Sequence, residues 1–182
     1  MLLAGHSYGG AVITNAASSA PNVTGLVYVA AFAPDEGESL GEAASGSRDA
    51  ILSTAQVEYR YPVGLDGQTA VEFGINPGLF RDLFAAGLPA ETAALLAATQ
   101  RPIAAAAFTD ISGPPAWKKL PSWALVATHD KAAGTDIVRS MAQRAGADIT
   151  EIEGSHLVMI SQPQAVTDLI VKAARAGADA RR

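Results

Sequence analysis

Short apolar stretches alternate along this chain with segments of helical periodicity. Residues 1–4, 23–32 and 122–130 are apolar runs with few polar positions, as expected of strands that are buried on both faces of a sheet. Residues 148–154 alternate between polar and apolar positions and predict a further short strand. Because strands that alternate with helices form parallel units, the pattern predicts an α/β fold with a mainly parallel sheet flanked by helices.

Three helices are predicted beside these strands. An Ala- and Ser-rich segment predicts the first over residues 10–20, and the second begins at a capping Thr135 and runs to about residue 145. The last takes Ser161 as its N-cap and has Pro163 in its first turn. Apolar residues at helical spacing predict its buried stripe, which comprises Val166, Leu169, Ile170, Ala173 and Ala174.

The middle of the chain has a different character. It contains Gly- and Pro-bearing loops and two helix-like segments, at residues 77–86 and 89–100. Aromatic side chains recur in it, at Tyr59, Tyr61, Phe73, Phe80, Phe84 and Phe108. We predict that residues 36–113 form a helical cap inserted into a core made of residues 1–35 and 114–182.

Composition narrows the class of protein. The 182 residues are 49% hydrophobic and 17% charged, which is typical of a globular domain. The net charge of −5 argues against nucleic acid or an anionic membrane surface as a partner. There is no cysteine, and the three histidines are too scattered to suggest a metal site. No apolar run reaches the ~18 residues of a membrane span, so we expect a cytoplasmic protein without metal.

The stretch LLAGHSYGGAV, residues 2–12, places a serine between a strand and a helix. A serine hydroxyl needs exposure and a nearby base to act as a nucleophile, and a sharp strand-to-helix turn provides the exposure. Small residues two positions on either side avoid clashes, which explains Gly5 and Gly9. We therefore predict Ser7 as the nucleophile and the N–H of Tyr8 as one oxyanion-hole donor. The alternative is a structural turn in which Ser7 only caps the helix.

An acid and a histidine follow at the positions that such a turn requires. Asp130 ends the strand-like run WALVATHD, and His156 follows the next strand in EIEGSH. In the order nucleophile, acid, histidine, His156 takes the Ser7 proton and Asp130 orients the imidazole ring.

Three other residues compete for these roles. Asp136 is a rival acid, although its position beside Thr135 is typical of a charge at a helix N-terminus. His6 lies inside the turn, where we expect it to pack or to form a structural hydrogen bond. His129 precedes the proposed acid and is interpreted as a surface residue.

At four places the chain resembles the serine α/β-hydrolase superfamily, in particular esterase-like members akin to plant methyl esterases and hydroxynitrile lyases. The resemblance rests on GHSYGGAVI, GLVYVAAFAPDEGES, PSWALVATHDK and MAQRAGADITEIEGSHLVMISQP, in that order. It implies catalytic Ser7, Asp130 and His156, no cofactor, and a small ester with an apolar part as substrate. It also implies a pocket lined by cap residues such as Phe80, Phe84, Trp117 and Leu157.

Two departures from this family pattern stand out. Relatives carry an isoleucine-proline pair after the acid, where this chain has DKAAGTD, which keeps Asp136 open as an alternative. Relatives also have strands before the serine turn and a loop there that gives a second oxyanion donor. We therefore expect that Met1 is not the natural start. Without upstream strands the first strand is a bare edge, which favours a homodimer.

Three functions remain in competition. The first is a serine hydrolase that cleaves small carboxylic esters through an acyl-enzyme, which the ordered Ser7, Asp130 and His156 favour. The second is a lyase of the hydroxynitrile type, for which Lys131 is a weak candidate as the charged group near the serine. The third is a truncated, catalytically weak or inactive domain that acts in binding.

Overall fold

The computed structural model describes residues 1–63 and 67–179. Four strands form a parallel sheet in the order β1-β2-β6-β7, and each neighbouring pair is parallel. These strands are β1 (Leu2–Ser7), β2 (Gly25–Ala31), β6 (Ser122–Ala127) and β7 (Asp148–Ile152). The predicted α/β fold with a mainly parallel sheet is confirmed.

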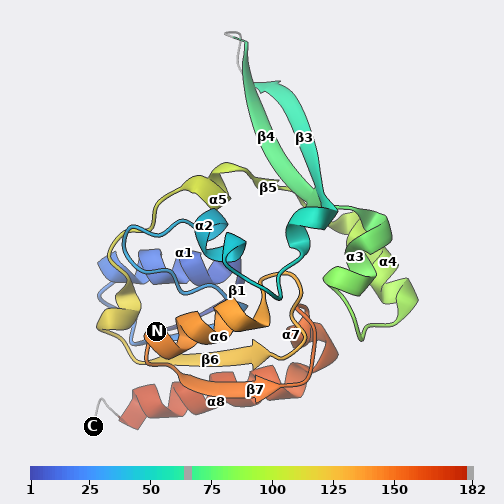
Figure 1. The fold of residues 1–182 in the computed structure, drawn as a ribbon. Coiled ribbons are helices and arrows are strands. Elements are labelled where there is room, and N and C mark those ends of the chain that lie inside the picture. Colours follow the sequence, from blue (N-terminus) through green and yellow to red (C-terminus); the bar gives the residue numbers. More distant parts are fainter. Residues whose placement is uncertain (64–66, 180–182) are drawn as a thin grey trace.

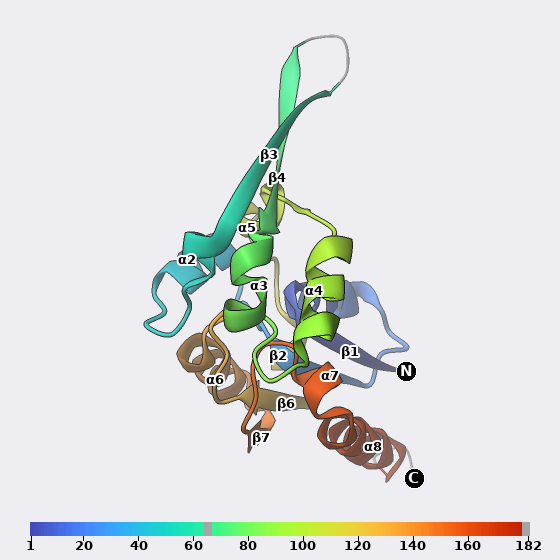
Figure 2. The ribbon, with the colours of Figure 1, turned by 90° about the vertical axis from the view of Figure 1, so that its right-hand side faces the viewer.

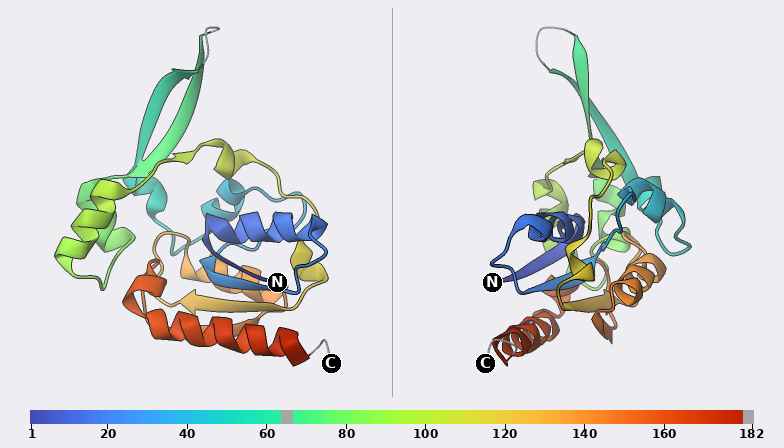
Figure 3. Two further views of the ribbon diagram at one scale, coloured as in Figure 1. Left: turned by 180° about the vertical axis from the view of Figure 1, so that it is seen from behind. Right: turned by 90° about the vertical axis from the view of Figure 1, so that its left-hand side faces the viewer.

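Helices cover both faces of this sheet, as Figure 3 shows for α1 and α8. Helices α1 (Tyr8–Ala16) and α6 (Thr135–Arg144) pack on one face, and α8 (Pro163–Asp179) packs on the other. Every residue of β2 and β6 is buried, and alternate side chains of each strand enter the two apolar clusters. Burial on both faces explains why these two strands are nearly continuous apolar runs in the sequence.

Three details at helix ends differ from the predictions. Helix α1 begins at Tyr8, directly after Ser7, and a 3₁₀ turn at Ala17–Ser19 replaces the end of the predicted helix. Thr135 does not cap α6, because its hydroxyl donates to the carbonyl of Ala127 at 2.8 Å. Ser161 closes the short helix α7 (Val158–Ser161) and does not cap α8.

The buried stripe of α8 is confirmed in part. Val166, Leu169 and Ala173 are buried, and Ile170 is half-buried against the same cluster. Ala174 is exposed. The remaining stripe is narrow, which fits a helix that covers one face of a sheet.

Residues 36–113 leave the sheet after β2 and return before β6. They form helices α2 (Leu40–Ser45), α3 (Pro77–Leu83), α4 (Ala90–Thr99) and α5 (Ala106–Thr109), with a 3₁₀ turn η2 (Leu52–Ala55). The two predicted helical segments correspond to α3 and α4, which pack side by side (Figure 2).

This segment also contains an antiparallel sheet that the sequence did not predict. Its order is β3-β4-β5, with β3 (Gln56–Val63), β4 (Gln68–Ile75) and β5 (Ile103–Ala104). The hairpin of β3 and β4 projects away from the rest of the molecule (Figure 1). The segment expected to be helical is therefore a mixture of helices and strands.

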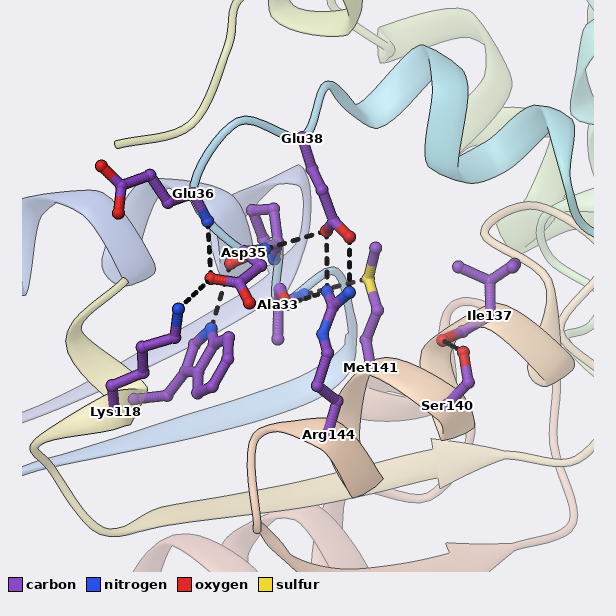
Figure 4. A network of polar contacts seen from close by, with 11 residues as sticks. Ala33, Asp35, Glu36, Glu38, Lys118, Ile137, Ser140, Met141 and Arg144 are labelled. Carbon is purple, nitrogen blue, oxygen red and sulfur yellow. Dashed lines mark hydrogen bonds and ion pairs between the residues drawn. The ribbon is translucent and has the colours of Figure 1, made fainter. Parts of the chain in front are cut away.

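The chain that leaves β2 is fixed to the core by a polar network (Figure 4). Arg144 at the end of α6 donates to both carboxylate oxygens of Glu38, at 2.5 and 2.7 Å, and to the carbonyl of Ala33 at 3.2 Å. Lys118, in the 3₁₀ turn η3 (Ala116–Lys118), pairs with Asp35 at 2.5 Å. These ion pairs are largely exposed, so each contributes at most about 1 kcal/mol to stability.

Strand β1 lies at an edge of the sheet, beside β2 only. The homodimer expected through this edge stays a prediction. In the part of the chain that the structure describes, no helix combines the length and the apolar character needed to cross a membrane.

Candidate active site

The serine turn is a strained junction between β1 and α1. Ser7 has φ 53° and ψ −124°, a region that side-chain-bearing residues rarely adopt and that costs of order 1–3 kcal/mol. A Cβ added to Gly5 would lie 2.4 Å from the carbonyl oxygen of Gly9, so the turn closes only with glycine there. Gly9 itself has open space, whereas a Cβ on Gly10 would lie 2.2 Å from the carbonyl oxygen of Phe32. The steric need for glycine is therefore confirmed at Gly5. At Gly9 the prediction is wrong, and the second position that excludes a side chain is Gly10.

The neighbouring strand deforms to match this turn. The register of β1 against β2 runs from His6 opposite Val29 to Ser7 opposite Ala31, so Ala30 is an extra residue. Ala30 has φ 43°, which identifies a β-bulge. Beyond it, the N–H of Phe32 donates to the carbonyl of Ser7 at 3.2 Å. The bulge thus places the Phe32 backbone against the serine turn.

Asp130 is a buried carboxylate whose two oxygens have separate partners. Oδ1 accepts the N–H groups of Ala132 and Ala133 at 2.9 and 3.0 Å, and Oδ2 lies 2.8 Å from Nδ1 of His156. Burial alone would raise the pKa of Asp130, but the His156 charge and these hydrogen bonds outweigh it and lower the pKa. Asp130 is therefore ionised at neutral pH.

His156 is buried and oriented on one side only. Its Nδ1 donates to Asp130, whereas no polar atom of the described residues bonds its Nε2. The ring packs in tilted orientations against the rings of His6 and Phe84, whose centroids are 4.5 and 4.7 Å away. A neutral imidazole that donates through Nδ1 to this carboxylate carries its lone pair on Nε2, as a base requires.

Neighbouring groups hold the loop of His156 from two sides. The Nε2 of His6 donates to the carbonyl of His156 at 2.9 Å, and the hydroxyl of Ser155 donates to the carbonyl of Ala86 at 2.6 Å. Burial and the nearby His156 lower the pKa of His6 to about 4, so His6 is neutral above that pH. His6 is thus a packed, hydrogen-bonding residue, as its position in the turn predicted.

The structure separates the competing residues from this group. Asp136 accepts hydrogen bonds from Ser47 and from the N–H of Arg48, not from a histidine. Burial would raise the pKa of Asp136, but these two hydrogen bonds, a third from the N–H of Ile137 and the charge of Arg48 outweigh it and lower the pKa. His129 and Lys131 are exposed, and neither lines the cavity described below.

Ser7 and His156 both line one cavity of about 660 Å³. No hydrogen bond joins the Ser7 hydroxyl to Nε2 of His156 in the described structure. Tyr8 lines the same cavity, and its N–H is the first of α1, where helical N–H groups lack partners within the helix. The candidate nucleophile, base and oxyanion donor therefore meet at one opening.

The cavity walls are mainly apolar. All five phenylalanines of the chain line the cavity, namely Phe32, Phe73, Phe80, Phe84 and Phe108. Leu157 lines it as well, so three of the four predicted pocket residues face this space. Trp117 does not line it: this side chain is buried in the apolar cluster of α1 and α6, and its Nε1–H donates to the carbonyl of Pro34 at 3.0 Å.

The sequence did not single out Phe32, Phe73 or Phe108 as lining residues. Phe73 and Phe108 belong to the series of aromatics in residues 36–113, and that series was the available signal. Phe32 gave no such signal, because it ends an apolar run that reads as a buried strand. Within the described residues, no group of three or more His, Asp or Glu side chains could hold a metal ion.

Comparison with known proteins identifies the family. The family model described as "Alpha/beta hydrolase family" matches residues 2–169. The chain belongs to the alpha/beta hydrolase family. The α/β-hydrolase membership expected from the four motifs is confirmed by this match, and the similar proteins described next support its esterase-like part.

Individual relatives are similar over different lengths. A carbendazim hydrolyzing esterase from Nocardioides sp. (strain SG-4G) is 54% identical over 41 residues, which are 22% of this chain and 17% of that esterase. The structure of polyneuridine aldehyde esterase superposes with a TM-score of 0.75 at 19% identity, covering 96% of this chain and 71% of that chain. The structure of a pyrethroid hydrolase from Sphingobium faniae JZ-2 superposes with a TM-score of 0.74 at 21% identity. The superposition covers 98% of this chain and 72% of that chain. At these identities the two superpositions establish a shared fold.

Proposed function

We propose that this chain hydrolyses carboxylic esters, with Ser7 as nucleophile, His156 as base and Asp130 as the acid that orients the imidazole. The observation that carries the proposal is the buried Asp130–His156 pair: His156 lines the same cavity as Ser7, and its Nε2 has no hydrogen-bond partner among the described residues. A buried polar atom without a partner needs an explanation. A base that bonds the serine or the leaving group during the reaction provides one.

The reaction proceeds in two halves. Ser7 Oγ attacks the ester carbonyl carbon while its proton passes to Nε2 of His156, and the C–O bond to the alcohol then breaks as Nε2 returns the proton to the alcohol. Water repeats the sequence on the acyl-enzyme and releases the acid. Asp130 stays ionised throughout and stabilises the imidazolium, which agrees with its lowered pKa.

Charge on the carbonyl oxygen develops beside the N-terminus of α1. The N–H of Tyr8 is proposed as one donor to this oxyanion, and the helix dipole acts in the same direction. Helix α1 is nine residues long, and its N-terminal residue Tyr8 lines the cavity.

The cavity supports an ester with an apolar part as the substrate. Four of the phenylalanines that line it, Phe73, Phe80, Phe84 and Phe108, come from residues 36–113. We therefore propose that this segment is the cap that selects the substrate. A lyase reaction finds no support from Lys131, which lies outside the cavity lining.

The test is the intact mass of the chain after exposure to a fluorophosphonate, with Ser7→Ala as the control. The serine oxygen displaces fluoride from phosphorus, so one adduct is expected on the wild type and none on the variant. Asp130→Asn should slow labelling while leaving a folded chain. Absence of an adduct on a chain that still unfolds cooperatively would reject the proposal.

A further inference from the structure

We infer that Asp136 anchors residues 47–53, which form part of the cavity wall, to the loop that carries Asp130, and that it thereby acts as a positioning residue for the substrate. This inference rests on the proposed function. The family pattern drew attention to Asp136 only as a rival acid, and the structure gives it different partners.

Asp136 and residues 47–49 hold each other by hydrogen bonds in both directions. Oδ1 of Asp136 accepts the Ser47 hydroxyl at 2.5 Å, and Oδ2 accepts the N–H of Arg48 at 2.8 Å. In return, the N–H of Asp136 donates to Oδ2 of Asp49 at 3.0 Å. Asp49 thus satisfies a free N–H in the first turn of α6, where a negative charge is favoured.

The backbone conformation at Gly134 and the side chains packed against it both favour glycine at this position. Gly134 has φ 90°, and a Cβ there would lie 2.2 Å from the Ser47 hydroxyl and 3.1 Å from the Cβ of Ala50. The N–H of Ile51 also donates to the carbonyl of Lys131 at 2.9 Å. Ser47 further accepts the N–H groups of Asp49 and Ala50, at 3.1 and 2.9 Å. Residues 47–51 therefore form one turn that is held by its own hydrogen bonds and is bonded to residues 131–136.

This turn connects the cavity wall with the catalytic acid. Ala50, Leu52 and Ser53 line the cavity on the side of residues 47–53. Ala132 and Ala133 line it on the side of the acid loop, and their N–H groups bond Asp130. In the described structure, Asp136 bonds to neither Asp130 nor His156. Loss of its hydrogen bonds to Ser47 and Arg48 should therefore make residues 47–53 more mobile and leave the Asp130–His156 hydrogen bond in place.

Steady-state kinetics with two esters test this role. The substrates are p-nitrophenyl acetate, whose acyl group is too small to fill the cavity, and p-nitrophenyl phenylacetate, whose ring reaches the wall. Asp136→Ala should raise KM for the phenylacetyl ester about fivefold, because loss of its hydrogen bonds to Ser47 and Arg48 loosens the wall without removing it. The kcat for the acetyl ester should stay within about twofold. Asp168→Ala, an exposed aspartate on α8, is the matched control and should change neither value.

Ser47→Ala and the double variant separate a specific contact from general destabilisation. If the two side chains act through their mutual bond, Ser47→Ala should reproduce the KM effect and the double variant should add little to it. Asp136→Asn keeps an acceptor oxygen and should restore part of the selectivity. Equal losses on both esters, or fully additive losses, would overturn the inference.

Amide hydrogen exchange provides a readout that does not depend on activity. Asp136→Ala should remove the protection of the Arg48 and Ile51 N–H groups and leave that of the β6 amides unchanged. If the wild type fails to react with fluorophosphonate and with both esters, the proposed function fails, and exchange still decides whether Asp136 holds residues 47–53. Retained protection in the variant would show that it does not.

Discussion

The central sheet and the β3–β4 hairpin are both β-structure, yet they differ in almost every physical respect. All seven residues of β2 are buried, whereas the six residues from Glu58 to Val63 in β3 are exposed. The sheet supplies Ser7 at the end of β1 and Asp130 after β6. The segment that contains the hairpin supplies most of the apolar cavity wall. Chemistry is thus proposed at the carboxyl ends of strands of the central sheet, and selection in the segment that carries the exposed hairpin.

This difference makes separable predictions for the two regions. Changes at the ends of the central strands should affect turnover or global stability. Changes in residues 36–113 should affect mainly which ester is cleaved. The following predictions run from the largest expected effect to the smallest.

Ser7→Ala should reduce kcat for p-nitrophenyl acetate by about 10⁴-fold or more, since loss of the nucleophile disables the triad as a unit. The midpoint of thermal unfolding should change little, because the hydroxyl has no structural partner in the described residues. The measurement is ester hydrolysis followed at saturating substrate, with calorimetry on the same sample. Residual activity above about one hundredth of wild type would contradict Ser7 as nucleophile.

Gly5→Ala should destabilise the chain by more than about 3 kcal/mol, since the new Cβ meets the backbone of the serine turn and cannot be relieved by a side-chain movement. Gly9→Ala is the matched control. Its Cβ has open space within a helix, so it should change the free energy of unfolding by less than about 1 kcal/mol and can be stabilising. Urea unfolding of both variants measures the contrast, and equal values would disprove the close approach at Gly5.

Stability should fall as the pH is lowered from about 6.5 to about 4. The pKa of His6 is depressed to about 4 in the folded chain, so between these values the unfolded chain binds a proton that the folded chain does not. The full loss is about 3 kcal/mol, from 1.36 kcal/mol per pKa unit. The carboxylate of Asp130 acts only at lower pH, because its folded pKa lies below 3.8.

His6→Asn should flatten this pH dependence while keeping a side-chain N–H for the carbonyl of His156. Urea unfolding at pH 7, 6, 5 and 4.5 measures the difference between the two chains. An unchanged slope in the variant would assign the pH dependence to another group.

Phe73→Ala should raise KM for p-nitrophenyl phenylacetate about tenfold and leave kcat for the acetyl ester nearly unchanged. Phe73 lines the cavity, and its ring meets that of Phe108 edge to face with 6.0 Å between the centroids. Loss of a large apolar side chain from a substrate pocket typically costs a factor of ten or more in selectivity. Trp117→Phe is the contrast, because Trp117 is buried in the core. It should lower stability by about 1–2 kcal/mol through the lost hydrogen bond to Pro34 and leave both KM values unchanged.

Tyr61→Ser on the projecting hairpin should change the free energy of unfolding by less than about 0.5 kcal/mol. Tyr61 is 41% exposed, and its hydrogen bond with Glu72 on the hairpin surface should contribute little, so the change stays within the range of surface substitutions. Urea unfolding and the two-ester assay measure it together. A loss of several kcal/mol would show that the hairpin is as tightly integrated as the central sheet.

The sequence by itself determined the elements that are held together by local patterns. The buried strands are readable because both their faces are apolar, and the serine turn is readable because its glycines lie close to it in the chain. Ser7, Asp130 and His156 were predicted to lie near one another because each follows a strand, and the carboxyl ends of parallel strands share one edge of the sheet. These predictions needed no knowledge of how distant segments pack.

Only the tertiary structure decided the features that depend on contacts between distant residues. Residues 56–63 alternate between polar and apolar positions, which is a strand pattern, but Pro62 within the run argues against a strand, and only the pairing with β4 decides between the two. Trp117 and Phe84 are both large aromatic side chains, and only packing sends one to the core and the other against His156. In the sequence Asp136 is an ordinary acidic residue of a first helical turn. Only the fold shows that the absence of a side chain at Gly134 allows Ser47 to bond Asp136. Burial and close approach are set by the whole fold, and a local pattern cannot encode which segments will meet.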